Sequence, residues 1–324
     1  GRWAIAPGRA GGGLAAGAKY LDEGTLYVAK FNADGTGQWL ELSFGKNGID
    51  AGNATYAFAD QADVVTNCRI AADIRGATKM DRPEWGGVNP LNGEAYMTLT
   101  NNSNRVDPTA TPTGSQLKPD AANPRAYSDT FTNADGSTKT NKGNVNGHII
   151  RWREAGGSVA ATSFAWDIYL FGAQADAAAN VNLSNLTAVN DFSSPDGLYF
   201  DPRGLLWIQT DDGAYTDVTN CMMLAAVPGK VGDGGAATAV GGIATIKGAN
   251  ATGDTVRRFL VGPKECEITG IAVTPDGKTL FFNVQHPGED GKLTALTSNW
   301  PDSQTTAGST KRPRSATVVV TRKD

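Results

Sequence analysis

Three segments of the chain share one pattern: a carboxylate, a short apolar strand, an Xaa-Pro turn with glycine, and a second apolar strand. Self-similarity of this kind is the sequence signature of radial β architectures, in which each copy contributes to one small sheet. The repeat therefore predicts an all-β fold of the β-propeller type. The copies are Glu84–Thr100, Asp196–Asp211 and Glu267–Asn283.

The carboxylates stand at matched positions in the three copies. Glu84 and Asp196 each lie six residues before the proline of their turn, and Glu267 lies eight residues before its own. Because side chains two residues apart on a strand point to the same face, we expect all three acids to face one way, toward the central channel. The alternative is that each acid only solvates a turn.

The rest of the chain is mostly strand-like, with two exceptions. A helical spacing of apolar residues over 58–75 predicts one inserted amphipathic helix, and the polar stretch 103–146 predicts a long surface loop insertion. The copies lie 112 and 73 residues apart, further than a blade of about 40–45 residues. We therefore expect a single β-propeller domain over 1–324, or its carboxy-terminal part, that falls short of a closed ring.

Charge and hydropathy exclude several classes of partner. Lys+Arg number 29 against 33 Asp+Glu, so the chain carries no basic footprint for nucleic acid. No apolar run approaches the roughly 20 residues of a membrane helix, so no membrane span is expected. Three cysteines with no metal-like spacing are interpreted as structural residues: Cys68, Cys221 and Cys266.

The acids suit a hard cation. Carboxylate oxygens at a strand rim are typical ligands of Ca²⁺, whereas His148 and His286 are too few and too far apart for an imidazole-rich zinc site. Arg82 stands two residues before Glu84, and a guanidinium beside metal-bound carboxylates forms a clamp for a phosphoryl oxygen. The alternative for Arg82 is a plain ion pair with Glu84. His286 is a candidate phosphate contact, and its alternative is a packed residue of a turn.

The chain resembles the PhoX alkaline phosphatases. The resemblance rests chiefly on Asp81-Arg-Pro-Glu-Trp85, Ser194-Pro-Asp-Gly-Leu-Tyr-Phe-Asp-Pro-Arg-Gly-Leu-Leu-Trp-Ile-Gln-Thr-Asp211, Cys266-Glu-Ile-Thr-Gly270 and Gln285-His-Pro-Gly-Glu289. It implies a six-bladed propeller, export to the periplasm or beyond, and hydrolysis of small phosphomonoesters by a cluster of calcium and iron. Carried onto matching positions, the resemblance makes Arg82 the catalytic, phosphate-binding residue and makes Glu84, Asp196 and Glu267 metal ligands.

One part of the family pattern is missing. The family's iron-binding cysteine lies in an amino-terminal Cys-Glu-Glu triplet, and this sequence has no such triplet. We therefore expect a carboxy-terminal portion of the enzyme, with the amino-terminal half as a possible partner. Two other interpretations stay open from the residues: a lactonase-like calcium propeller hydrolase, and an inactive calcium-stabilised propeller fragment.

Overall fold

The computed structural model describes residues 2–5, 24–132, 136–211, 218–302 and 311–323. The chain divides into two compact units, of which unit 1 holds residues 1–79 and 153–166, and unit 2 holds residues 80–152 and 167–324. The single domain over 1–324 stays a prediction. No helix among the described residues has the length and apolar character needed to cross a membrane.

Unit 1 is a small antiparallel sheet with two short helices. β2 (Gly24–Phe31) and β3 (Thr36–Leu42) form a hairpin, which β1 (Arg2–Ile5) and the first residues of β9 (Ser163–Phe171) extend on either side. The structure divides the expected single helix into α2 (Gln61–Thr66) and α3 (Cys68–Ile74). The break is at Asn67, whose side chain turns back to donate a 2.7 Å hydrogen bond to Asp63 Oδ1.

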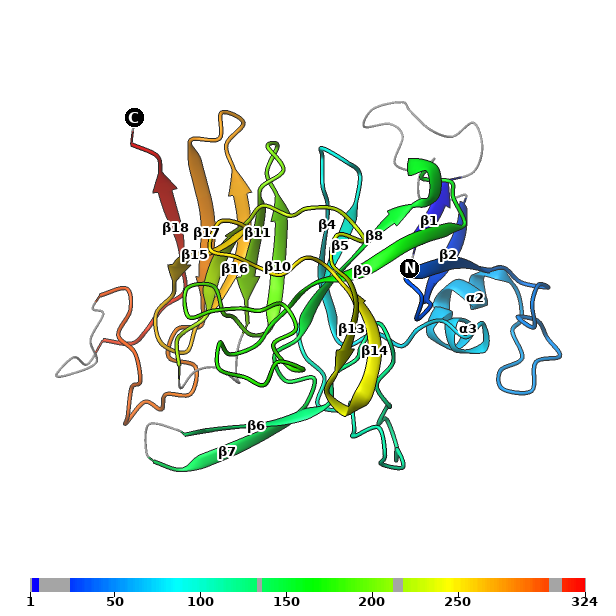
Figure 1. Cartoon of the computed structure of the whole chain (residues 1–324), viewed down its shortest axis with the longest axis horizontal. Coiled ribbons are helices and arrows are strands. Elements are labelled where there is room, and N and C mark those ends of the chain that lie inside the picture. Colours follow the sequence, from blue (N-terminus) through cyan, green and yellow to red (C-terminus); the bar gives the residue numbers. More distant parts are fainter. Residues whose placement is uncertain (1, 6–23, 133–135, 212–217, 303–310, 324) are drawn as a thin grey trace. The chain divides into compact units, whose positions relative to one another are not determined.

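Unit 2 carries the repeat as neighbouring antiparallel sheets (Figure 1). The first two strands of each sheet are the two strands of one copy, and β10 packs against both β4 and β16. The propeller-type arrangement expected from the repeat is therefore confirmed. The first sheet contains β4 (Pro83–Val88), β5 (Ala95–Leu99) and β8 (His148–Glu154), and β9 continues it beyond β8. The second consists of β10 (Pro195–Phe200), β11 (Leu206–Thr210), β12 (Met222–Ala226) and β15 (Val256–Val261), and the third of β16 (Glu267–Val273), β17 (Thr279–Gln285) and β18 (Ala316–Thr321).

The glycines of the repeat close the turns between the paired strands. Gly93, Gly204 and Gly277 have φ angles of 74°, 82° and 67°, in the left-handed region that side chains with a Cβ rarely adopt. Each glycine follows the turn proline of its copy, so the proline opens the turn and the glycine reverses the chain into the second strand. This is the physical reason for the repeated Xaa-Pro and glycine pattern.

Two further hairpins complete unit 2. β6 (Tyr127–Thr132) pairs with β7 (Thr138–Gly143) inside the polar stretch 103–146, whose role as a loop insertion stays a prediction. β13 (Gly235–Ala239) pairs with β14 (Ile243–Lys247), which meets β9 in a parallel bridge. Single 3₁₀ turns cover Ala155–Gly157 and Val240–Gly242.

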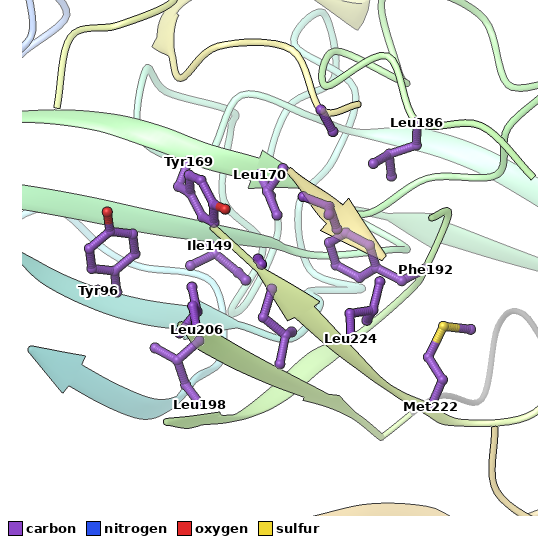
Figure 2. Close-up of a cluster of buried hydrophobic side chains, with 14 of the residues drawn as sticks. Tyr96, Ile149, Tyr169, Leu170, Leu186, Phe192, Leu198, Leu206, Met222 and Leu224 are labelled. Atoms are coloured by element: carbon purple, nitrogen blue, oxygen red, sulfur yellow. The ribbon is translucent and has the colours of Figure 1, made fainter. Parts of the chain in front are cut away.

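Apolar side chains fill the space between successive sheets of unit 2. Figure 2 shows the larger cluster, where Tyr96 of β5 meets Tyr169 of β9 edge to face with 5.4 Å between ring centroids. Fully burying a side chain of this kind stabilises the fold by about 1.5–3 kcal/mol, so the sheets are fixed relative to one another within the unit. Other members are Ile149, Leu170, Leu186, Phe192, Leu198, Leu206, Met222 and Leu224.

A second apolar cluster joins the β10 and β16 sheets. Along β17, Leu280, Phe282 and Val284 are buried, and the residues between them face outward or toward the rim. This period-2 alternation is what a half-buried strand requires. The cluster includes Trp207 and Met223 of the preceding sheet, so the acid-bearing ends of β10 and β16 are held beside each other.

Candidate metal and phosphate site

The three predicted carboxylates stand at the starts of the three neighbouring first strands. Glu84 is the second residue of β4, Asp196 the second of β10, and Glu267 the first of β16. Each of these strands changes register near its start, between residues 83 and 86, 195 and 198, and 269 and 271. Irregularities of this kind re-aim the side chains next to them, so strand alternation alone does not place the acids.

Asp196 occupies the centre of the acidic group. Burial and, in decreasing order, the charges of Glu84, Glu267 and Asp211 together raise the pKa of Asp196 to about 7, while Arg82 acts in the opposite direction. Burial also raises the pKa of Glu267, with Asp211 as the next cause. The acids from three sheets therefore act on one another, as expected for a shared site.

Arg82 lies among these carboxylates. Its Nε donates a 2.8 Å hydrogen bond to Glu84 Oε1, and a guanidinium nitrogen lies 3.9 Å from Asp211 Oδ2. The Arg82 side chain is 53% exposed, so one edge of the guanidinium is open to a ligand. The ion pair and the clamp are thus compatible, because Glu84 occupies only part of the five-donor fork.

His286 belongs to the same site. Its Nε2 lies 3.6 Å from Glu267 Oε2, and its Nδ1 lies 3.3 Å from Glu289 Oε2. Gln285 donates a 2.8 Å hydrogen bond to Glu267 Oε2, which fixes that carboxylate from the neighbouring strand. Ligand atoms of Asp211, Glu267 and His286 all lie within 4.8 Å of one another, close enough to share one cation.

The donor set fits a hard cation. Four carboxylates, Glu84, Asp196, Asp211 and Glu267, supply oxygen ligands of the type that Ca²⁺ takes, and one arginine does not neutralise them. A buried carbonyl oxygen without a hydrogen-bond partner, Gln209 Oε1, also lies directly beside the backbone of Gly197. Such a set is electrostatically costly without a cation, since like charges at short range disfavour ionisation.

Cys266 does not fit an iron ligand. It is 4% exposed and packs in the apolar cluster with Cys221 and Ile268, and burial raises the pKa of its thiol to about 12. A metal ligand must be a thiolate, which this environment disfavours. The structural role that the sequence suggested for this cysteine agrees with its surroundings.

Hydrogen bonds between sheets hold the acid-bearing strands in place. The Thr98 hydroxyl on β5 donates to the backbone carbonyl of Asp196 at 2.7 Å and accepts from the backbone N–H of Trp85 at 2.9 Å. Gln209 on β11 makes the corresponding 3.3 Å contact to the carbonyl of Gly270 on β16. Each second strand thus fixes the first strand of the next sheet.

Replacing Thr98 with valine is expected to lower the free energy of unfolding by about 1–3 kcal/mol. Valine has the same shape but deprives the half-buried Trp85 N–H of this acceptor and the buried Asp196 carbonyl of this donor. Chemical denaturation measures the loss. Thr130→Val on the exposed hairpin is the matched control, and equal stability losses in both variants would contradict the anchoring role.

The structure brings all the predicted site residues into one region, and it adds Asp211. In the sequence the adjacent pair Asp211-Asp212 could cap a turn or chelate a metal, and the turn is the favoured interpretation of such a pair. Its neighbour Asp212 lies outside the described residues. Gln209 carried no sequence signal, because its contact with the next sheet depends on tertiary packing.

Comparison with known proteins gives one family. A family model described as alkaline phosphatase PhoX matches residues 6–288. Among solved structures, the chain is similar to Pseudomonas fluorescens PhoX in complex with vanadate, a transition-state analogue, with 39% sequence identity and a TM-score of 0.70. The match covers 95% of this chain and 46% of that chain, so this chain spans about half the length of its relative. A search of curated proteins found no match.

Proposed function

This chain belongs to the PhoX alkaline phosphatase family, and from that premise we propose that its site serves the metal-dependent hydrolysis of phosphomonoesters to release inorganic phosphate. The observation that carries the proposal is Arg82, an exposed guanidinium set among carboxylates from three sheets. Cations held by the carboxylates and the guanidinium together make a site for a dianionic phosphoryl group. Measurable turnover of a phosphomonoester by this chain would exclude the alternative of an inactive calcium-stabilised fragment.

We assign the roles as follows. Glu84, Asp196 and Glu267 hold the metal ions, with Asp211 as a further ligand, and Arg82 binds and stabilises the phosphoryl group. His286 contacts a phosphoryl oxygen from the β17 side, beside Glu267. When bound, the cations neutralise phosphate charge and lower the pKa of a coordinated water.

The chain's own residues orient the substrate. Glu84 accepts a hydrogen bond from the Arg82 Nε and so fixes the orientation of the guanidinium. The remaining N–H groups of Arg82 can then donate to the phosphoryl oxygens. Charge that develops on those oxygens during phosphoryl transfer is stabilised by a donor already in place, with no reorganisation needed. Glu289 and Glu267 flank His286, so the two carboxylates hold its imidazole ring in place beside the metal-binding acids.

The metal we propose is Ca²⁺, on the basis of the oxygen-rich donor set. Fe³⁺ remains a proposal that rests on the family alone, and Cys266 is not offered as its ligand. We further propose a periplasmic or extracellular location, small phosphomonoesters as substrates, and the other half of the longer enzyme as a partner.

Turnover of 4-nitrophenyl phosphate with Ca²⁺, measured before and after EGTA treatment, tests the function. We expect activity that EGTA abolishes and that added Ca²⁺ restores, because the carboxylates cannot hold phosphate without a cation. A parallel assay with a lactone separates the lactonase-like alternative. Full phosphatase turnover in EGTA, or lactone turnover alone, would overturn the proposal.

Replacing Arg82 with lysine is expected to lower kcat/KM for 4-nitrophenyl phosphate by about 10²-fold. Lysine keeps the charge but loses the planar fork that reaches Glu84 and phosphate together. The matched control is Arg203→Lys in the β10–β11 turn, where the arginine pairs with Asp201 away from the site. Unchanged kinetics in the Arg82 variant would contradict its role.

A further inference from the structure

A cavity of about 200 Å³ lies beside the β6–β7 hairpin in unit 2. Its charged lining residues are both lysines, and the others offer amides, hydroxyls and one apolar side chain. A cavity with cationic and neutral hydrogen-bonding walls favours an anion over a cation. The lining residues are Asn101, Ser103, Lys139, Asn141, Lys142, Asn144, Val145 and Ser194.

The cavity adjoins the phosphate site along two strands. Ser194 stands two residues before Asp196, and its carbonyl accepts a 3.1 Å hydrogen bond from the backbone N–H of Asp211. On the neighbouring sheet, Asn101 follows Thr100, whose N–H donates to the carbonyl of Arg82 at 3.0 Å. The same backbone segments that carry the site residues thus form part of the cavity wall.

A buried hydroxyl is available inside this wall. Ser194 is 1% exposed, and its Oγ lies 3.0 Å from Ser193 Oγ, which accepts a 3.0 Å hydrogen bond from Asn146 Nδ2. Either serine hydroxyl can donate to the other, so the Ser194 Oγ can offer a ligand a donor or a lone pair, according to which way the pair is oriented. Ser194 also has a φ of 50°, a conformation that is costly for a residue with a Cβ.

The lysines approach from the hairpin. Lys139 and Asn141 alternate onto one face of β7, where the Lys139 ammonium lies 5.7 Å from the Phe131 ring centroid. Asp129 lies opposite Asn141 on the same face but does not line the cavity. Lys142 follows Asn141 on β7 and also lines the cavity, so both lysines come from this one strand, whereas the other lining residues Ser194 and Asn144 are buried.

We propose that this cavity is an oxyanion subsite, which binds the second acidic group of a small phosphomonoester while Arg82 binds the first. The inference rests on the proposed function and names the substrate class of that site: short phosphomonoesters that carry a carboxylate or a further phosphate. The volume supports a small group, because it is below the roughly 300–1,000 Å³ of pockets for drug-sized ligands. Free inorganic phosphate shares this chemistry and is the other source.

A matched pair of substrates tests the subsite. 3-Phosphoglycerate and glycerol 3-phosphate differ by one carboxylate, and we expect the wild-type KM to be about tenfold lower for the former, as one charge-assisted hydrogen bond gives. The KM for glycerol 3-phosphate divided by that for 3-phosphoglycerate is thus about ten in the wild type. In Lys139→Gln/Lys142→Gln this KM ratio is expected to fall to about one. Ser194→Ala is expected to lower the ratio part of the way, and Lys278→Gln, in the β16–β17 turn, to leave it unchanged.

Inhibition by inorganic phosphate shows which anion occupies the cavity. If the double lysine variant has a lower KM ratio and an unchanged Ki for phosphate, the occupant is the second acidic group of the substrate. If its Ki for phosphate is raised and its KM ratio is unchanged, the occupant is free phosphate. Either supports an oxyanion subsite. If neither quantity changes in the double lysine variant, the subsite does not exist.

Calorimetry separates failure of the subsite from failure of the proposed function. D-Glycerate, which carries the carboxylate without phosphate, is titrated into the calcium-loaded full chain. We expect binding that the double lysine variant loses and Lys278→Gln keeps. Absence of turnover with both substrates would overturn the phosphatase proposal alone, whereas glycerate binding that is absent or indifferent to the lysines would overturn the subsite.

Discussion

Replacing Asp196 with asparagine is expected to abolish the rise in melting temperature that Ca²⁺ produces, while the metal-free variant melts at or above the metal-free wild type. Asp196 is 7% exposed, and its pKa is raised to about 7 by burial and by Glu84, Glu267 and Asp211. The folded chain thus holds a charge here that it disfavours. Asparagine removes the charge and a metal ligand together.

The sign of the pH dependence follows from the raised pKa. Because the ordinary pKa of 3.8 is raised to about 7 in the folded chain, the folded state binds the Asp196 proton more tightly than the unfolded state does. In the metal-free wild type, the contribution of Asp196 to the free energy of unfolding is fully present below about pH 4 and is lost as the pH rises to about 7. The asparagine variant lacks that loss, so the melting temperatures of the two proteins, plotted against pH, should diverge between these pH values.

Phosphatase turnover is expected to fall in the same variant as well. Loss of a residue that only hydrogen-bonds to a metal ligand lowers activity by roughly 10–100-fold, and loss of a ligand itself should lower it more. Differential scanning calorimetry at pH 8, with EGTA and with Ca²⁺, gives the stability arm. Asp254→Asn is the control, since this aspartate side chain is 94% exposed and pairs only with the exposed Arg257 in that contact. A Ca²⁺-induced stabilisation that survives in Asp196→Asn would remove this residue from the metal site.

The sequence predicted the shared site because its determinants are local. A carboxylate at a fixed distance from a turn proline defines a strand start, and Glu84, Asp196 and Glu267 each occupy one. The propeller-type fold was predictable for the same reason, since each copy contains both strands and their turn. The register changes beside the acids were not predictable, because they arise from pairing between strands.

Buried polar groups were the hardest feature to predict. The composition of 103–146 indicates a solvated surface, yet Arg125 and Asn144 are fully buried. Arg125 donates to the carbonyls of Gly172 and Val181 at 2.7 and 2.9 Å, so its charge is met by backbone from distant segments. Composition reports the polarity of a side chain and carries no information about such partners.

The same polar network leads to the largest expected loss of stability. Asp81 directly precedes Arg82 and is fully buried, and its Oδ1 accepts hydrogen bonds from Arg105 Nε at 2.6 Å and from Asn102 at 2.7 Å. Its Oδ2 accepts a 3.0 Å hydrogen bond from Asn144. One carboxylate therefore satisfies three side chains from two segments and compensates the charge of Arg105, whose side chain is 1% exposed.

Asp81→Asn is expected to lower the free energy of unfolding by about 3–5 kcal/mol, because it removes the charge that faces a buried guanidinium. The remaining acidic contact of Arg105, with Asp120 at 3.3 Å, is to a carboxylate that is 39% exposed. Arg82 is expected to lose its fixed position as well, so that the KM for 4-nitrophenyl phosphate rises at temperatures where the variant is still folded. Denaturant titration and steady-state kinetics measure the two effects.

A second substitution separates the charge from the shape of the site. In Asp81→Asn/Arg105→Met both partners of the buried pair are gone, and replacing a whole pair by a group of similar size costs much less than breaking it. We therefore expect the double variant to recover part of the stability that Asp81→Asn loses, while Asp254→Asn, at an exposed ion pair, changes stability by at most about 1 kcal/mol. If the double variant is less stable than the single one, Asp81 stabilises the fold through Asn102 and Asn144 rather than through the charge of Arg105.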